Sequence, residues 1–385
     1  MATIDPQRRR LSMSQCAAAQ VSEGGAADLD LATKIENAGL TAVFKDAKKV
    51  VSIGSVTDND LTRRQSFQEK DLDMIHSFKS DAEAALWVKA QGIGYSCRKG
   101  LKPESPNQDS FSVLIVESEF ALYCVYDGHG PRGHDISNFV RETLVKLFVG
   151  SDVRTTDPKQ AFEDAFVAVQ RLLEKMDPKR PGDLDAKMSG TTCTMAYHDF
   201  AKDRLTIAHV GDSRAVMGMK QEEPRKEITS EDLTHDHKPN VPEEKLRIES
   251  ANPPGRVVFD GFYNHRVFSL KGMYPGLNMS RAIGDVIGHS EAGLTAFPDV
   301  KEVDLRDFRK GGSSSLTLLL CTDGVWEFIT SEEATKQVFE YPPTRAMDAM
   351  QQLVSLGWKR WMQDSDHEIS DDITGIIVDM SKPPS

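Results

Sequence analysis

The sequence predicts a mixed α/β fold in which mainly antiparallel β-strands are covered by amphipathic helices. Three short runs of β-branched and aromatic residues are almost continuously apolar, which is typical of strands buried on both faces. These runs are residues 111–116, 120–126 and 315–322. Apolar residues recur at helical spacing in residues 136–148 and 158–176, which predicts two helices that each cover a sheet.

The other predicted elements support the antiparallel arrangement. Further strands are predicted at residues 91–96, 191–198, 204–210, 213–217, 256–262, 266–270 and 373–378. Further helices are predicted at residues 82–88, from residue 242 onward and at residues 344–362. Thr330 and Glu333 form a capping box, which predicts that one more helix begins there. Because Glu117-Ser118-Glu119 and similar short turns separate consecutive strands, hairpins and a meander are expected.

Composition and charge exclude several classes of protein. The 385 residues are 39% hydrophobic and 28% charged, which is ordinary for a soluble globular protein. The net charge of −12 argues against broad binding to nucleic acid or anionic membrane. No apolar stretch is long enough to span a bilayer, no signal-peptide core is present, and Ala2 breaks the myristoylation pattern.

Five widely spaced cysteines form no CxxC pair. Their odd number and spacing favour reduced thiols and exclude a zinc site of that type. We therefore expect a cytoplasmic or nuclear protein without a membrane span.

Residues 1–85 differ in composition from the rest of the chain, and we expect them to form an N-terminal extension that is partly disordered and regulatory. We expect the domain at residues 86–381 to fold without this extension. Residues 1–25 are polar and lack periodicity, whereas residues 28–51 show helical patterning. Two arginines precede Ser12 and Ser66 in the same arrangement, which is typical of phosphorylation by basophilic kinases. The alternative is a solvated basic patch.

Aspartates lie where apolar strands end or begin, and this pattern indicates chemistry. Asp127 and Asp323 follow such runs, while Asp371 and Asp109 precede them. Carboxylates at the edge of a core are costly unless cations compensate them. Oxygen ligands without thiolates favour Mg²⁺ or Mn²⁺. The alternative for a single Asp-Gly-His-Gly segment is a polar turn after a core strand.

A histidine and an arginine complete this candidate site. His129 lies two residues beyond Asp127 and could protonate a leaving oxygen. Arg98, in a cation-rich loop before Asp109, could bind a phosphate through two hydrogen bonds. A water bound to the metal ions would be the nucleophile, so the residues indicate metal-assisted hydrolysis of a phosphoester.

The sequence closely resembles the type 2C metal-dependent protein phosphatases, which act on phosphoserine and phosphothreonine. Eight segments occur in that family's order between residues 92 and 380. They are Asn107-Gln108-Asp109-Ser110, Tyr126-Asp127-Gly128-His129-Gly130, Ser189-Gly190-Thr191-Thr192, Val210-Gly211-Asp212-Ser213-Arg214, Leu233-Thr234-His235-Asp236-His237-Lys238-Pro239, Met279-Ser280-Arg281-Ala282-Ile283-Gly284-Asp285, Cys321-Thr322-Asp323-Gly324-Val325-Trp326-Glu327 and Asp371-Asp372-Ile373-Thr374.

The resemblance implies a role for each matching residue. Asp127 matches the carboxylate that bridges two metal ions, Gly128 lends its carbonyl, and Asp323 and Asp371 match further ligands. His129 matches the general acid, and Arg98 the phosphate-binding arginine. Asp109, Asp285 and Gln108 match positions that support the ligands. Asp212 and Glu327 match positions near a weaker third ion. The alternatives are that Asp212 is an acid in a turn and that Glu327 is an acid at a helix N-terminus.

The resemblance also implies the architecture: two stacked β-sheets between two helical layers, α-β-β-α, with a flap at residues 256–276 beside the site. Two departures bear on activity. Gln108 stands where many relatives have Glu, and Asp372 where Asn is common. Gln108 leaves one alternative open, a pseudophosphatase scaffold with impaired metal binding. Since every ligand acid is present, we expect an active monomeric enzyme whose partners are phosphoprotein substrates.

Overall fold

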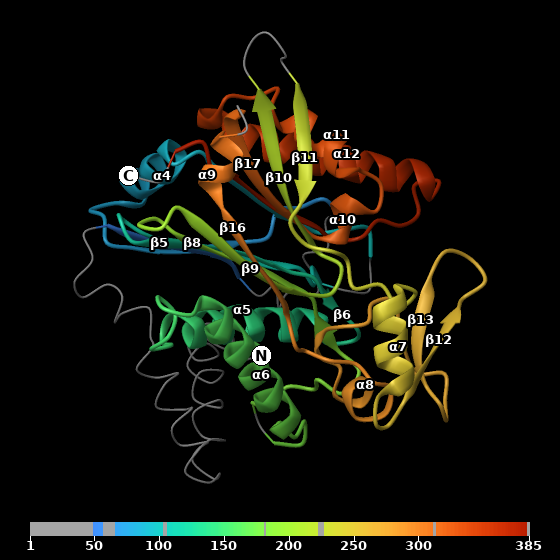
Figure 1. Ribbon diagram of the computed structural model, residues 1–385. Helices are drawn as coiled ribbons and strands as arrows, with labels where there is room; N and C mark the ends of the chain where they lie inside the picture. Colours follow the sequence, from blue (N-terminus) through green and yellow to red (C-terminus); the bar gives the residue numbers. More distant parts are fainter. Residues whose placement is uncertain are drawn as a thin grey trace, which may run out of the picture.

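The computed structural model describes residues 49–56, 66–102, 106–180, 182–221, 227–310 and 313–382. Two β-sheets are stacked face to face, and helices cover the outer face of each, which gives four layers in the order α-β-β-α (Figure 1). Neighbouring strands in both sheets are antiparallel, so the predicted fold class is confirmed.

The larger sheet has seven strands. In spatial order they are β16 (Asp299–Asp304), β9 (Arg204–Val210), β8 (Cys193–Asp199), β5 (Phe120–Tyr126), β4 (Ser110–Val116), β1 (Val50–Ser55) and β2 (Leu72–His76). Every residue of β4 and β5 is buried. Because alternate side chains point to opposite faces, Tyr123 and Val125 of β5 enter the core between the sheets, whereas Leu122 and Tyr126 face the helices.

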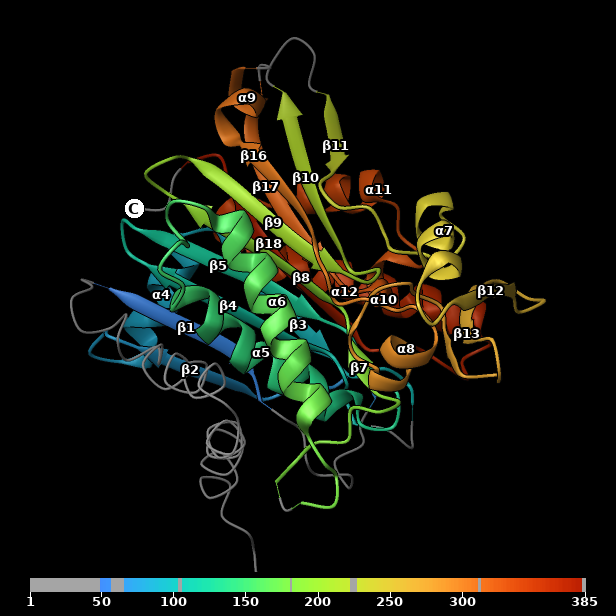
Figure 2. The ribbon, with the colours of Figure 1, turned by 60° about the horizontal axis from the view of Figure 1, so that its bottom comes forward.

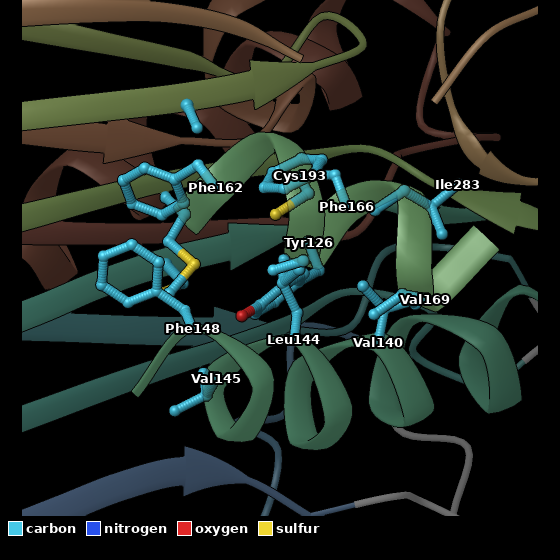
Figure 3. Packing of buried hydrophobic residues seen from close by; sticks show 14 of the residues in the cluster. Tyr126, Val140, Leu144, Val145, Phe148, Phe162, Phe166, Val169, Cys193 and Ile283 are labelled. Atoms are coloured by element: carbon cyan, nitrogen blue, oxygen red, sulfur yellow. The ribbon is translucent and has the colours of Figure 1, made fainter. Parts of the chain in front are cut away.

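Helices α5 (Gly133–Val149) and α6 (Pro158–Lys175) cover the outer face of this sheet. Their apolar faces meet in a core whose aromatic rings lie close together, with the centroids of Phe148 and Phe162 4.0 Å apart (Figure 3). Asp157 begins α6 by accepting a hydrogen bond from the backbone N–H of Gln160 at 3.0 Å. The two predicted helices are therefore confirmed.

The smaller sheet has five strands. In order they are β11 (Ile228–Asp232), β10 (Arg214–Gln221), β17 (Ser313–Cys321), β18 (Ile373–Asp379) and β3 (Ile93–Arg98). Helices α10 (Asp323–Trp326), α11 (Ser331–Val338) and α12 (Ala346–Asp364) pack on its outer face. As predicted, Thr330 caps α11 by accepting a hydrogen bond from the N–H of Glu333 at 3.2 Å.

Two small sheets lie at one end of the sandwich. The first contains β15 (Ile283–Gly284), β7 (Gly190–Thr191) and β6 (Gly128–His129), and the second contains β12 (Gly255–Phe259), β13 (His265–Ser269) and β14 (Pro275–Leu277). The remaining helices are α4 (Asp81–Ala90), α7 (Pro242–Ser250), α8 (Val286–Glu291), α9 (Leu305–Lys310) and the 3₁₀ helix η1 (Pro343–Arg345). Figures 1 and 2 place α7, α8 and the β12–β13 hairpin together. Of the described helices, none has the length and apolar character needed to cross a membrane.

The larger sheet begins upstream of the predicted boundary at residue 86. Strand β1 lies inside it, hydrogen-bonded to β4 on one side and to β2 on the other. The last residues of the segment with helical patterning, Val50 and Val51, are extended and buried in this strand. Residues 28–48 and the candidate phosphosite Ser12 lie outside the described residues, and the candidate Ser66 is partly exposed in a turn before β2.

Deletion of residues 1–85 is expected to abolish cooperative unfolding, because it removes β1 and β2 and exposes the edge of β4. Val50, Val51 and Ile53 are fully buried, and each contributes about 1.5–3 kcal/mol against a typical total stability of about 5–15 kcal/mol. Thermal unfolding followed by circular dichroism measures the effect. The control is deletion of residues 1–48, which leaves β1 in place; a cooperative transition in the longer deletion would contradict this prediction.

His198 makes the fold sensitive to acid. It is fully buried on β8, and neither ring nitrogen has a hydrogen-bond partner among the described residues. Burial lowers its pKa to about 4, whereas in the unfolded chain it titrates near pH 6.5. The unfolded chain therefore binds the proton first, and stability is lost as the pH falls from 6.5 towards 4.

His198→Leu is expected to recover about 2 kcal/mol of the stability that the wild type loses between pH 7 and pH 5, since 1 pKa unit corresponds to about 1.4 kcal/mol. Urea unfolding at the two pH values measures the difference. His235→Leu, at an exposed histidine, is the matched control. An equal loss of stability in wild type and His198→Leu would contradict the prediction.

Candidate active site

Acids from both sheets meet at one edge of the sandwich. In the larger sheet, β4 and β5 are antiparallel neighbours, so Asp109 before β4 lies beside Asp127 after β5. In the smaller sheet, β17 and β18 are likewise antiparallel, which brings Asp371 close to Asp323. Besides burial, the charges of Asp323 and Asp371 both raise the pKa of Asp127, so the acids of the two sheets form one cluster.

These acids repel one another in a buried setting. Burial, followed by the charges of Asp323 and Asp109, raises the pKa of Asp127 well above its usual range. Burial and the charges of Asp371 and Asp212 likewise raise the pKa of Asp323. Such a cluster is stable in its charged form only beside cations.

The donor atoms fit Mg²⁺ or Mn²⁺. Oδ1 of Asp323 and Oδ1 of Asp212 are buried and have no hydrogen-bond partner within the described part of the chain. All candidate ligands are oxygen atoms, which these hard cations prefer. Gly128 fits the close packing of the loop, because a Cβ atom there would lie 2.4 Å from the carbonyl oxygen of Gln108. The structure therefore brings Asp127, Gly128, Asp323 and Asp371 to one edge of the sandwich, and their role as metal ligands stays a prediction.

His129 is held by Asp285. The Nε2 atom of His129 lies 2.6 Å from Oδ2 of Asp285, whose side chain is 1% exposed. Burial lowers the pKa of His129, but the charge and hydrogen bond of Asp285 outweigh this effect, and the pKa is raised overall. Gly190 leaves room for Asp285, since a Cβ at Gly190 would lie 2.2 Å from Oδ2. The sequence does not reveal this pairing.

The turn at Asn107–Asp109 connects the two halves of the cluster. The Gln108 N–H donates to Oδ2 of Asp372 at 2.8 Å, and its side-chain Nε2 donates to the Gly130 carbonyl at 2.7 Å. Oδ2 of Asp109 accepts from the Thr322 hydroxyl at 2.9 Å, next to Asp323. Gln108 and Asp109 therefore support the loops that carry the predicted ligands. The two residues that depart from the family pattern, Gln108 and Asp372, contact each other.

Comparison with known proteins decides the family. The family model described as protein phosphatase 2C matches residues 104–365. The chain belongs to the protein phosphatase 2C family. It is 33% identical over 283 residues to "Probable protein phosphatase 2C 61" from Arabidopsis thaliana, covering 72% of this chain and 81% of that protein. It is 30% identical over 304 residues to "Probable protein phosphatase 2C 48" from Oryza sativa subsp. japonica, covering 72% and 81%.

The solved structures agree on the fold. The serine-threonine phosphatase 2C from Toxoplasma gondii superposes with a TM-score of 0.60 at 23% identity, covering 74% of this chain and 94% of that chain. At this identity the likeness concerns the fold, and it matches the four-layer sandwich described above. The chain is therefore a type 2C protein phosphatase with the family's architecture.

At the end of β3 and in the loop that follows it, it is Lys102 and not Arg98 that reaches Asp371 of this phosphatase. Lys102 forms an ion pair and a hydrogen bond with Asp371. The guanidinium of Arg98 is turned to the segment before β2, where Nε lies 3.0 Å from Oε2 of Glu69 and Nη1 donates to the Phe67 carbonyl at 3.1 Å. Arg98 is thus engaged elsewhere in this structure. The sequence offered only the cation-rich loop as a signal for Lys102.

Asp212 and Glu327 lie beside the cluster on different elements. Oδ2 of Asp212 accepts a hydrogen bond from Nζ of Lys238 at 2.5 Å, and its carboxyl group contributes to the raised pKa of Asp323. Glu327 is exposed one turn after Asp323. Both positions therefore adjoin Asp323, as a third ion would require.

Other residues of the matching segments make structural contacts. Asp236 forms two hydrogen bonds with Arg214, at 2.8 and 2.9 Å. The Thr192 hydroxyl accepts from the Asp127 N–H at 3.0 Å, which fixes the backbone of a predicted ligand. Thr191 is buried in β7, and its hydroxyl donates to the Thr192 carbonyl.

A second group of potential ligands does not fit a metal. Atoms of His209, His237 and Asp299 lie within 4.8 Å of one another. However, the two imidazole rings are stacked with 6° between their planes and 4.4 Å between centroids. In-plane lone pairs of parallel rings cannot converge on one ion. His237 is held instead by the Gly211 N–H, which donates to its Nδ1 at 3.1 Å.

The predicted flap, residues 256–276, forms the β12–β14 sheet. Val267 is buried and packs in a small core with Ile248 of α7. The hairpin tip carries exposed aromatic side chains, with Phe262 80% and Tyr263 88% exposed. This sheet lies near β6, the strand that contains His129, at one end of the sandwich (Figure 1).

Proposed function

We propose that this phosphatase hydrolyses phosphoserine and phosphothreonine in proteins with Mg²⁺ or Mn²⁺ as its cofactor. The observation that carries the proposal is the convergence of Asp127, Asp323 and Asp371 from both sheets beside the His129–Asp285 pair. Unpartnered buried carboxylate oxygens and mutual repulsion supply the reason for cations at this point.

In this proposal the four predicted ligands hold two ions. Asp127, Asp323 and Asp371 would contribute carboxylate oxygens to these ions, and Gly128 would contribute its carbonyl oxygen. When bound, the ions would lower the pKa of a water molecule so that it can act as the nucleophile near neutral pH. Asp212 and Glu327 would hold a weaker third ion, for which Lys238 competes as a cation at Asp212.

His129 provides the proton that the leaving oxygen needs. A serine or threonine alkoxide is a poor leaving group, so its departure depends on a proton donor. Asp285 lies 2.6 Å from Nε2 of His129 and favours the protonated imidazole, so the ring can serve as the proton donor. Asp285 also orients the imidazole. Lys102 would release Asp371 to the metal and pair with the substrate phosphate.

We further propose that the enzyme acts as a monomer in the cytoplasm or nucleus and that the flap contributes to the choice of phosphoprotein. Exposed aromatic side chains at the hairpin tip support a contact with the substrate chain. The pseudophosphatase alternative depends on Gln108 alone. The Gln108 amide donates to the Gly130 carbonyl next to His129, and every predicted ligand acid is present, which favours an active enzyme.

Hydrolysis of a phosphothreonine peptide, followed by phosphate release, tests the proposal. We expect turnover with Mn²⁺ or Mg²⁺, none with EDTA, and little with a phosphotyrosine peptide of the same sequence. Phosphate release that is unchanged by EDTA would contradict the cofactor. Absence of release with either metal would favour the scaffold.

A further inference from the structure

A short segment before β2 is attached to the outer edge of β3. We call residues 66–71 the N-terminal strap; they precede the region matched by the family model. The Phe67 N–H donates to the Lys99 carbonyl at 2.7 Å, and the Lys99 N–H donates to the Gln68 carbonyl at 3.0 Å. The Lys70 N–H donates to the Cys97 carbonyl at 2.8 Å. The strap therefore extends the smaller sheet by a short antiparallel stretch.

Glu69 fastens the strap, which makes its path well defined. Its Oε1 accepts from the Cys97 N–H at 2.6 Å, and its Oε2 accepts from the Ser96 hydroxyl at 3.0 Å. Oε2 also pairs with Arg98 at 3.0 Å. Phe67 packs on Trp358 of α12 with 4.8 Å between ring centroids. These contacts direct the next side chain, Lys70, inward.

Lys70 is a buried lysine whose ammonium binds backbone oxygens. The residue is 5% exposed, and Nζ donates to the Asp109 carbonyl at 2.5 Å and to the Asn107 carbonyl at 3.3 Å. Nζ also lies 3.5 Å from the Ser110 hydroxyl. An ammonium buried in this way costs free energy. The charges of Asp109 and Asp372 partly offset that cost, because both favour the protonated amine.

The two carbonyls that Lys70 holds belong to the turn that supports the active site. The third carbonyl of that turn, of Gln108, accepts from the Ser137 hydroxyl at 2.6 Å. With all three fixed, the Gln108 side chain reaches the Gly130 carbonyl and the Asp109 side chain reaches the Thr322 hydroxyl. Each contact ends next to a residue proposed to act on metal or substrate.

We propose that Lys70 is a positioning residue for catalysis: it fixes the Asn107–Asp109 turn, and through Gln108 and Asp109 it sets the loops of His129 and Asp323. This inference rests on the proposed function. It gives the strap a role in positioning the active site, although the strap precedes the residues that the family model matches. Loss of groups that orient metal ligands typically costs about 10–100-fold in activity.

The test compares Lys70→Met, which keeps the length but loses the donors, with Lys70→Arg, which keeps the charge and donors. Lys49→Met is the matched control, because Lys49 forms a surface ion pair with Glu117 at the opposite end of β4. Hydrogen exchange of the metal-free chain reports on the turn, and kcat and KM for a phosphothreonine peptide are measured at saturating Mn²⁺. Thermal unfolding confirms that each variant is folded at the assay temperature.

In Lys70→Met we expect the backbone amides of the turn to exchange hydrogen at least tenfold faster than in wild type. We expect kcat to fall by about 10–100-fold and KM to stay unchanged. The kcat and exchange rates of Lys70→Arg should stay within about threefold of the wild-type values. Those of Lys49→Met should equal the wild-type values. If Lys70→Met does not fold, Lys70→Gln takes its place, because its side-chain amide retains a donor. We then expect faster amide exchange in the turn and a lower kcat, with both changes smaller than those expected for Lys70→Met.

Two results would overturn the inference. A folded variant with lower thermal stability but wild-type kcat would make Lys70 only a structural residue. Tighter Mn²⁺ binding by calorimetry with unchanged kcat would make it only a charge that opposes the metal. If the wild type itself neither binds Mn²⁺ nor hydrolyses the peptide, the proposed function fails instead, so the two failures are distinguishable.

Discussion

Asp127→Asn is expected to lower kcat for a phosphothreonine peptide by about 10³-fold or more at a Mn²⁺ concentration that saturates the wild type. Asparagine removes one negative charge from the point where acids of both sheets meet. Metal ions supply several kcal/mol of transition-state stabilisation, and each 1.36 kcal/mol corresponds to a factor of ten in rate. Asp323→Asn should have a comparable effect, because Asp323 belongs to the same cluster, in which burial and the charge of Asp323 raise the pKa of Asp127.

The metal-free Asp127→Asn protein should at the same time be more stable than the metal-free wild type. Burial and neighbouring charges raise the pKa of this acid, so neutralising it relieves repulsion. Asp236→Asn is the matched control, since Asp236 is paired with Arg214 rather than with the cluster. We expect its kcat within about threefold of wild type. Equal activity of Asp127→Asn and wild type would refute the assignment of Asp127.

His129→Gln is expected to lower kcat by about 10²–10⁴-fold on the phosphothreonine peptide, the usual contribution of a positioned general acid. The loss should be much smaller on p-nitrophenyl phosphate, whose leaving group departs without a proton. Comparison of the two substrates under the same conditions therefore separates loss of the proton donor from general damage to the site.

Asp285→Asn should reproduce this pattern at smaller size, because it removes the charge that holds Nε2 of His129 at 2.6 Å. We expect kcat to fall by less than in His129→Gln, with little change in KM, because Asp285 acts only through the imidazole that it orients. A loss of equal size on both substrates would indicate that Asp285 acts on the fold rather than on the proton donor.

Much of the fold and the ligand set could be predicted from the sequence, because the signals are local. The run at residues 120–126 is apolar throughout, and β5 is indeed buried on both faces. Asp127 and Asp323 each follow such a run directly, so the sequence predicts a carboxylate at the edge of the core at both positions. Pattern alone could not show that β5 and β17 end at the same edge, which depends on the stacking of the sheets.

Other features depend on contacts between distant segments and leave no local pattern. Strand β1 is too short and too close to a segment with helical patterning to be recognised, although its pairing with β4 is regular. The pairing of His129 with Asp285 spans 156 residues. The loop around Arg98 contains several cations, and only the fold determines that Lys102 faces the acids while Arg98 faces Glu69.

The central claim, that the clustered acids hold the metal ions that hydrolysis requires, is tested most directly by titrating metal-free protein with Mn²⁺ in a calorimeter. For the wild type, the heat of binding should reach a plateau as the Mn²⁺ concentration increases. The rate of phosphopeptide hydrolysis should rise over the same range of Mn²⁺ concentration. Asp127→Asn should lose the high-affinity heat. Identical binding curves for wild type and Asp127→Asn, or hydrolysis that is complete before any Mn²⁺ binds, would contradict the claim.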